Sequence, residues 1–550
     1  MQHPAEERLS YVSSPTSKQD AYGVMDTPLG LENGALRAGP PPDYKSAEVL
    51  GLLAQYVAVG LLYGAMPNLL YPLFVGYFHL TGNQFNSAKV LIGLGWSLKA
   101  FVGILSDCVP IVGYRRKPYM LIGWTSCLAS MLVLATMDMG DPFFRDASSS
   151  RGPINTTNIN PHAATTGGIV VILCAWGTLS YVISDVPADA LVVELAQREP
   201  EAIRGRMQSL IYLTRTIASC ISTALIGFCL NSPRFAGSYS WDMGANTMFM
   251  LLAITSGAML PITYLFVLET PSPRVNLKQY VLQFWDLVQK RATWQIMLFS
   301  FLFNLLNAGV TSTAAPYVMY EWAKVENVNT QLTGILGNFI FAGVLGFMGK
   351  YGTLWNWKIV LVTTTLSANV IDAVVQFCTI YDLVRNQWFY IGVPLAENLP
   401  YAMQFIVTTF VIVELAEVGN EGVVYGLLTT VSNLPAAFGP VVANVVFGSF
   451  DVSAEAIAAD SPTTRNQVAA TYIIYYATTV LACFCVVLLP SQKSELHELQ
   501  VTSGKYPRVG GAVLGFCCLV LLYSIVASLL SMFESTMCMV IAGGKGCHAA

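Results

Sequence analysis

Charged residues are scarce in this sequence, and the residue patterns of several common catalytic and metal sites are absent. Only 11% of the 550 residues are charged, whereas soluble globular proteins carry about 25%. The chain has five histidines, and no Cys/His spacing fits a metal site. It contains neither a glycine-rich nucleotide-binding loop nor a nucleophile–base pair. We therefore expect no metal, no cofactor and no ATP-driven step, and we do not expect an enzyme.

The polar parts of the chain exclude further classes of protein. The formal net charge of −4 gives no reason to expect a nucleic-acid partner. The twelve cysteines lie mostly inside apolar runs, where they act as small hydrophobic residues rather than as a disulfide framework. Residues 1–46 are polar and rich in proline and glycine. We interpret them as a disordered cytosolic tail rather than a signal peptide.

What the chain does contain is a long series of apolar runs. Hydrophobic residues make up 54% of it, and runs of about twenty residues follow one another, which is typical of a polytopic helical membrane protein. The predicted helices are 47–79, 84–106, 117–137, 167–195, 206–230, 244–268, 293–320, 331–349, 357–381, 387–416, 422–450 and 468–490. A further run, 511–533, is long enough to span the membrane, which would place Cys538 and Cys547 outside, where they could pair.

The order of the runs predicts two halves. An N-terminal six-helix bundle, 47–268, is followed by a charged, amphipathic linker, 269–292, that could lie on the lipid surface. A C-terminal six-helix bundle, 293–490, and the segment 491–550 complete the chain. Basic residues concentrate in alternate loops, which favours a cytosolic N-terminus. This orientation places the glycosylation sequon at Asn155 outside.

A short internal repeat links the two halves. The tetrapeptide Val-Glu-Leu-Ala ends both the fourth and the tenth predicted helix, and it contains Glu194 and Glu414. Equivalent positions in two bundles are expected for parallel repeats. We interpret both glutamates as part of a cytosolic gate that pairs with loop arginines such as Arg204. Solvated surface charges are the alternative.

The loop after the second predicted helix contains residues that we interpret as a gate. It runs from Gly103 and Asp107 to a basic cluster that contains Arg115 and Arg116. Gly103 permits close helix contact, and Asp107 can accept hydrogen bonds from the start of a neighbouring helix, favoured by the helix dipole. Such a contact can form in one conformation and break in another. An ordinary positively charged loop is the alternative.

Three segments carry a resemblance to a known family. They are GILSDCVPIVGYRRKPYMLIGW (103–124), SDVPADALVVELAQ (184–197) and RGRMQSL (204–210). The chain resembles the folate-biopterin transporter family of the major facilitator superfamily. The resemblance implies two six-helix bundles that carry a folate or a pterin, with the run 511–533 as an addition to that plan.

Four charges lie inside the predicted N-terminal helices: Lys99, Asp185, Asp189 and Arg215. At about 1.5 Å of rise per residue, all lie at similar depth, between the cytosolic edge and the midplane. Because charges at this depth are costly, they are expected to face a cavity or one another. They could form a buried ionic lock or a substrate site in which a carboxylate binds a pterin edge and a cation binds the carboxylates of a folate.

The remaining candidates follow from the same reasoning. Trp176 and Tyr212 lie near the same depth and could stack on a pterin ring, although aromatic residues on a helix are more often packing. Asp372 and Glu397 lack an obvious basic partner in the C-terminal helices. Together with Asp189 they are candidates for proton coupling, and neutral hydrogen-bonded acids are the alternative.

These observations predict a proton-coupled secondary transporter for folate or pterin. We expect it to act as a monomer in the lipid bilayer, with the plasma membrane as its location. A transporter of another small metabolite, nucleoside-like or zwitterionic, and a pterin receptor that does not transport are the alternatives.

Overall fold

The computed structural model describes residues 40–145, 159–196, 198–199, 206–269, 271, 276–352, 355–415, 421–544 and 546–547. Within these ranges the regular structure is helical, and the only other pairing consists of isolated β-bridges. Eleven described helical segments are long and apolar enough to cross a membrane. The predicted all-α polytopic membrane protein is therefore confirmed.

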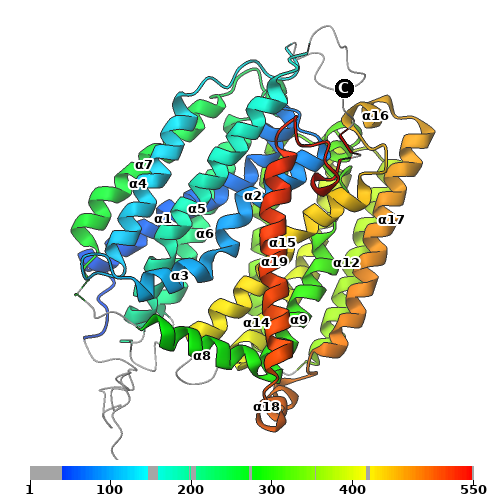
Figure 1. Cartoon of the computed structure of the whole chain (residues 1–550). Coiled ribbons are helices and arrows are strands. Elements are labelled where there is room, and N and C mark those ends of the chain that lie inside the picture. Colours follow the sequence, from blue (N-terminus) through cyan, green and yellow to red (C-terminus); the bar gives the residue numbers. More distant parts are fainter. Residues whose placement is uncertain are drawn as a thin grey trace, which may run out of the picture.

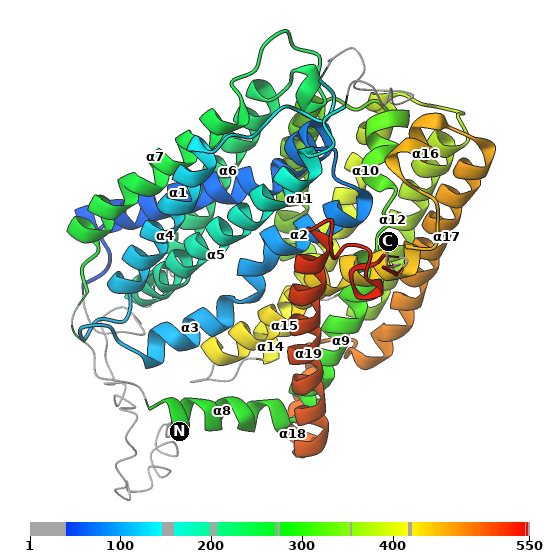
Figure 2. The same ribbon diagram turned by 45° about the horizontal axis from the view of Figure 1, so that its top comes forward.

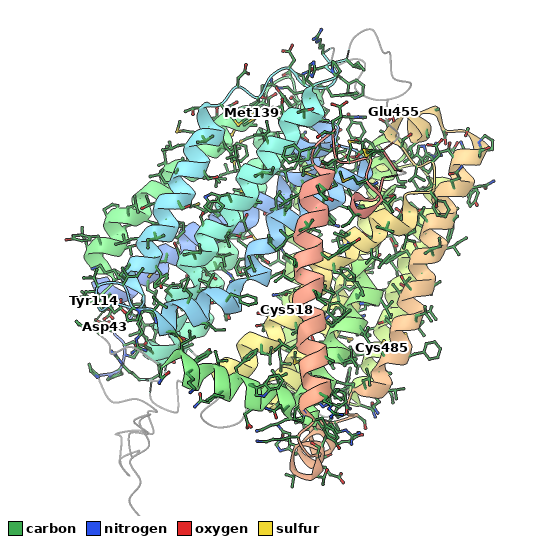
Figure 3. The ribbon with its side chains drawn as sticks, viewed as in Figure 1. Asp43, Tyr114, Met139, Glu455, Cys485 and Cys518 are labelled. Atoms are coloured by element: carbon green, nitrogen blue, oxygen red, sulfur yellow. A yellow bond between two sulfur atoms is a disulfide. The ribbon has the colours of Figure 1, made fainter. Side chains whose placement is uncertain are left out.

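The N-terminal half is built from six long helical segments, drawn blue to green in Figure 1. In Figure 3, Tyr114 precedes α4 (Lys117–Thr136) at one end of this half and Met139 follows it at the other. The segments are α1 (Ala47–Asn68) with η2 (Leu70–Tyr77), α2 (Gly82–Ser97) with α3 (Lys99–Cys108), α4 (Lys117–Thr136), α5 (Ala163–Ala196), α6 (Arg206–Cys229) and α7 (Ala245–Phe266).

The C-terminal half has six corresponding segments. They are α9 (Arg291–Asn304) with η7 (Leu305–Gly309), α10 (Ala315–Tyr317) and η8 (Val318–Trp322); α11 (Asn327–Tyr351); α12 (Trp357–Ile380); α13 (Gln387–Gly392) with η9 (Val393–Glu397) and α14 (Asn398–Leu415); α15 (Glu421–Phe447); and α17 (Pro462–Cys485) with η10 (Val486–Leu488). Shorter helices lie around them: η6 (Pro233–Phe235), α8 (Leu277–Gln289), α16 (Ala454–Ala459), α18 (Lys493–Thr502) and η11 (Val540–Ala542).

Several helix ends and breaks follow from local sequence. Ser46 caps α1 by accepting a hydrogen bond from the backbone of Val49, and Thr81 forms a capping box with Gln84 at the start of α2. The first segment changes to a π-helical form at η2, close to Pro67 and Pro72. Pro187 lies inside α5 and does not end it, since the helix continues to Ala196.

Hydrogen bonds between the two halves gather at one end of the molecule, which we call the α16 end and which lies at the top of Figure 1. Asn327 of α11 donates to the carbonyls of Ile226, in the last turn of α6 (3.0 Å), and of Leu230, just after it (2.6 Å). Asn86 of α2 donates to Asn444 of α15 at 3.1 Å. Because these contacts join opposite halves, they hold the α16 end closed.

A thirteenth long helix, α19 (Pro507–Ser531), lies against α2 and α15 at the seam between the halves. Its foot is fixed at the opposite end, the α8 end, where the backbone of Tyr506 donates to the carbonyl of Gln289 at 2.7 Å. Figure 2 shows α8 lying across this foot. Beyond α19, Cys538 and Cys547 form a disulfide, and Asn83 of α2 donates to the carbonyl of Gly543 at 3.2 Å.

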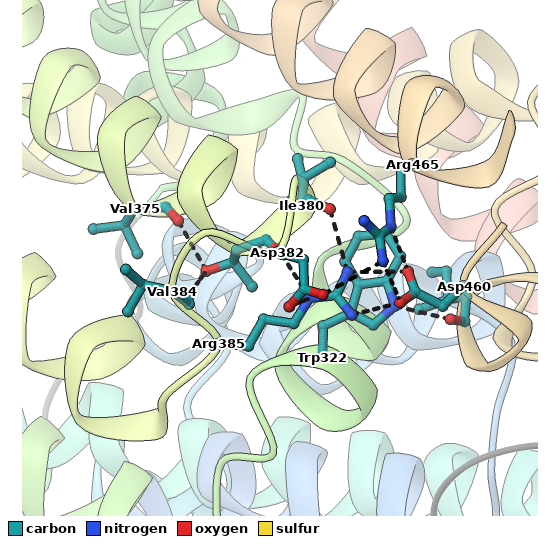
Figure 4. Close-up of polar contacts among 10 residues, drawn as sticks. Trp322, Val375, Ile380, Asp382, Val384, Arg385, Asp460 and Arg465 are labelled. Carbon is teal, nitrogen blue, oxygen red and sulfur yellow. Dashed lines mark hydrogen bonds and ion pairs between the residues drawn. The ribbon is translucent and has the colours of Figure 1, made fainter. Parts of the chain in front are cut away.

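At the α16 end of the C-terminal half, two arginines share one carboxylate (Figure 4). Arg385 and Arg465 approach Asp460 at 2.6 and 2.7 Å, and Arg385 lies 4.7 Å from the ring centre of Trp322. Burial alone would raise the pKa of Asp460, but hydrogen bonds from Arg465 and Arg385 outweigh it and lower this pKa to about 2. The cluster joins the loop after α12 to the start of α17.

We expect Asp460→Asn to destabilise the C-terminal half, because it leaves Arg385 and Arg465 with only the longer ion pairs to Asp382, at 3.4 and 3.7 Å. The loss should be about 1–3 kcal/mol and should appear as a lower melting temperature of the purified protein. Since the folded pKa lies below the ordinary value of about 3.9, the stabilisation is complete above about pH 5 and is lost as the pH falls toward 2. Equal melting of both forms at pH 7 would contradict this.

Candidate functional site

The central contact of the predicted charge cluster joins three side chains of the N-terminal half. The ammonium of Lys99, at the start of α3, lies 2.9 Å from Asp185 and 2.5 Å from Asp189. The two acids lie one turn apart on α5, so both face α3. Tyr56 of α1 donates to the second oxygen of Asp189 at 2.6 Å. The structure thus brings together three of the four predicted charges directly.

Asp185 holds the least satisfied atom of this cluster. Its side chain is completely buried, and its Oδ1 has no hydrogen-bond partner among the described residues. A buried acceptor without a donor costs about 1–3 kcal/mol. A ligand that presents an N–H or O–H donor would remove this cost. An ion pair with only a structural role has no need for a carboxylate oxygen that lacks a donor.

Aromatic rings form the wall beside the ion pair. Lys99 lies 5.1 Å from the ring centre of Trp96, and Trp96 donates from Nε1 to the Tyr181 hydroxyl at 3.2 Å. Tyr63 of α1 meets Trp96 edge to face, with 5.4 Å between ring centres. Flat, partly polar walls of this kind suit a planar heterocycle.

Arg215 of α6 lies on the other side of Tyr63 and forms a separate cation. Its guanidinium is 5.5 Å from the ring centre of Tyr63 and 5.1 Å from that of Tyr212. Gly60 allows α1 to approach the Arg215 backbone closely, because a Cβ there would lie 2.4 Å from its carbonyl oxygen. Among the described residues no carboxylate forms an ion pair with Arg215, although it interacts electrostatically with Asp185 and Asp189. Its guanidinium therefore has room to bind an anion directly.

The two aromatic residues predicted to line the site have different positions. Tyr212 does contact Arg215. Trp176 lies nine residues before Asp185, and about 100° per residue places it on the opposite face of α5. The residue is 56% exposed, and its indole N–H donates to Ser126 of α4 at 3.0 Å. The structure therefore separates Trp176 from the charge cluster.

The predicted gating residues form a contact network at the α8 end. Arg116 lies 2.6 Å from Asp107 and 4.0 Å from Glu194, and so connects α3, α4 and α5. Gly103 faces Val186 of α5, since a Cβ there would lie 3.6 Å from it. Arg115 lines, with Arg116 and Glu194, a cavity of about 510 Å³ at this end.

One member of this rim was missed by the sequence reasoning. Glu269, after α7, accepts hydrogen bonds from the backbone N–H groups of Arg115, Arg116 and Lys117 at 2.7–3.1 Å. A carboxylate at a helix N-terminus is favoured by the helix dipole. The prediction that Asp107 makes such a contact is not met, because Asp107 instead accepts from the Arg116 side chain. No capping pattern links two segments so far apart in the chain.

Three predicted positions cannot be placed. Arg204 and Asn155 lie outside the described residues, and so does the side chain of Glu414. Of the described charged rim residues, Asp107, Arg116 and Glu194 are brought together.

Comparisons with known proteins identify the family. The profile of the BT1 family matches residues 57–143 and 157–494. The chain belongs to the BT1 family. The cyanobacterial folate-biopterin transporter of Synechocystis sp. is 25% identical to this BT1-family chain over 360 residues, which are 62% of this chain and 64% of the relative. Folate transporter 1 of Plasmodium falciparum is 19% identical over 78% of this chain and 77% of its own.

Solved structures establish the fold. The D-xylose-proton symporter matches 81% of this chain and 98% of its own, with a TM-score of 0.53 and 15% identity. The inward-open conformation of the E. coli xylose transporter XylE matches 83% and 100%, with a TM-score of 0.51 and 16% identity. This BT1-family chain therefore has the major-facilitator fold, as predicted.

Proposed function

We propose that this BT1-family protein is a secondary active transporter that moves a folate or a pterin by alternating access and is driven by a proton gradient. The names of its relatives support the cargo. The observation that carries the proposal is the combination of a buried, unpartnered carboxylate oxygen on Asp185 and, on Arg215, a cation that contacts no carboxylate directly among the described residues.

The two groups suit opposite ends of a folate. A pterin presents an amino group and a ring N–H along one edge, and a carboxylate accepts such a pair well. The glutamate tail of a folate presents carboxylates, for which the planar guanidinium of Arg215 is suited. Tyr63 and Trp96 lie between the two charges and offer faces on which the ring system can stack.

The arrangement of the halves supports an inward-facing state. Under the proposed orientation, the N-terminus and the α8 end are cytosolic and the α16 end is outside. The hydrogen bonds of Asn327 and Asn86 join the halves at the outer end, while the rim cavity at the cytosolic end is lined by residues of the N-terminal half. Alternating access would reverse this by separating α6 from α11 and α2 from α15. We propose the plasma membrane as the location and a monomer as the working unit.

Uptake measurements test the proposal. Cells that express the chain should accumulate radiolabelled folate or biopterin, and a protonophore should reduce the accumulation. A panel of nucleosides and zwitterionic metabolites, measured in parallel, tests the alternative cargo. Absence of uptake for every pterin would refute the cargo, and uptake that is unchanged by the protonophore would refute the proton coupling.

A further inference from the structure

A second pair of acids lies in the C-terminal half, on elements that do not belong to the charge cluster. Asp372 of α12 accepts hydrogen bonds from Gln376 at 3.0 Å and from Tyr476 of α17 at 2.8 Å. Glu397, at the end of η9, accepts one from Tyr401 of α14 at 3.1 Å. The broken segment between Pro394 and Pro400 thus brings Glu397 toward α12 and α17.

The two acids influence each other and lack a cation. Asp372 and Glu397 interact electrostatically, and among the described residues no lysine, arginine or histidine forms an ion pair with either. Two ionised carboxylates in so apolar a place would repel each other and would each lose hydration. One positive charge must therefore be bound for the pair to be stable.

Two buried side-chain oxygen atoms in or near the pair lack a hydrogen-bond partner among the described residues, and we expect the positive charge to bind beside them. Glu397 is only 8% exposed and its Oε1 has no hydrogen-bond partner, and the same holds for the amide oxygen of Gln376, which is 7% exposed. Tyr390 of α13 lies beside Gln376 and within electrostatic range of both acids, so these groups surround one place. A proton on Glu397 would turn an unpaired acceptor into a donor and would cancel one charge.

The other groups that face the pair carry no fixed charge. They are tyrosines: Tyr390 of α13, Tyr401 of α14, and Tyr472, Tyr475 and Tyr476 of α17. The described residues of the chain contain no group of three acids, histidines or cysteines placed to hold a metal ion. By contrast, Asp189 forms an ion pair with Lys99 and receives a hydrogen bond from Tyr56.

We propose that Asp372 and Glu397 form the proton-binding site of this protein, with Glu397 as the proton carrier and Asp372 as its positioning partner. The role in coupling rests on the proposed transport function. An O–H bond forms at Glu397 with a proton from the outer solution, and it breaks when that proton passes to cytosolic water. The substrate would bind in the other half, so cargo and proton occupy separate sites.

Infrared spectroscopy of the purified full-length protein tests the site without any substrate. A protonated carboxylic acid gives a carbonyl band that shifts in heavy water. We expect the wild type to show a band that titrates with pH, and Glu397→Gln to remove it. Asp372→Asn should move its titration midpoint, while Glu498→Gln, on the exposed helix α18, should leave it unchanged. A band that persists unchanged in Glu397→Gln would overturn the proposal.

Proteoliposomes that hold the same variants test the coupling. With radiolabelled folate, uptake driven by a pH gradient should be at least about tenfold lower in Glu397→Gln than in the wild type. The variant should still exchange internal for external folate. Replacing sodium by choline should not change wild-type uptake. Gradient-driven uptake that survives in Glu397→Gln, or that requires sodium, would overturn the assignment. If the infrared results hold but the wild type exchanges no folate, the proton site stands and the proposed cargo fails.

Discussion

Asp185→Asn is expected to abolish uptake of folate and pterin while the protein still reaches the membrane. The substitution removes the charge that would hold the amino and N–H groups of a pterin edge. Hydrogen bonds to a charged group contribute about 1.5–3 kcal/mol each, so the loss of two should reduce uptake by at least about a hundredfold. Uptake should be measured per molecule at the surface, labelled with a membrane-impermeant reagent.

The contacts around Asp185 explain why the variant should fold. Lys99 keeps its second partner, Asp189, so no cation is left unpaired. Asn is close to Asp in volume and creates no cavity. Asp141→Asn, in an exposed loop where the acid is 71% exposed, is the matched control and should transport normally. Normal uptake by Asp185→Asn would mean that the cluster is neither the binding site nor a gate.

Arg215→Gln is expected to abolish folate uptake and to reduce biopterin uptake less. The guanidinium would bind the carboxylates of the glutamate tail, which biopterin does not possess. Arg215→Lys should recover only part of folate uptake, because an ammonium lacks the planar pair of donors. Competition between labelled biopterin and unlabelled folate in the same cells measures the difference.

The stability of the Arg215 variant should be nearly that of the wild type. Among the described residues Arg215 contacts the rings of Tyr63 and Tyr212 but no carboxylate, and such contacts contribute about 0.5–2 kcal/mol. A melting temperature close to that of the wild type would separate a binding defect from a folding defect. Equal losses of folate and biopterin uptake would contradict a role at the glutamate tail.

Much of the site was predictable because depth along a helix follows from residue number. The matched depths of Lys99, Asp185 and Asp189 placed them together correctly. The rotation of α6 about its own axis does not follow from residue number, which is why Arg215 was expected in the ion cluster and is found on Tyr63 and Tyr212. The position of Trp176 could have been predicted. It lies nine residues before Asp185, and at about 100° per residue this places it on the opposite face of the helix.

The same distinction holds for the fold. Features that depend on neighbouring residues were predictable, and contacts between distant segments were not. Apolar runs predicted the long helices, because length and hydropathy are local properties. The division of the predicted helix 84–106 at Leu98 and the wide turn η7 within 293–320 were not predicted, since apolar residues continue across both. Similarly, the contact between Glu269 and the start of α4 joins segments about 150 residues apart.

The helix α19 is held by the C-terminal half at one end and contacts the N-terminal half at the other. Its foot is tied to α8 and α9 through Tyr506 and Gly504, so it must travel with the C-terminal half. Its far end meets the N-terminal half at Asn83 and at Gly168, where a Cβ would lie 2.7 Å from the Met532 carbonyl oxygen. Under the proposed alternating access, opening at the α16 end would move the N-terminal half relative to α19, so the contacts at Asn83 and Gly168 would have to break and re-form in each cycle.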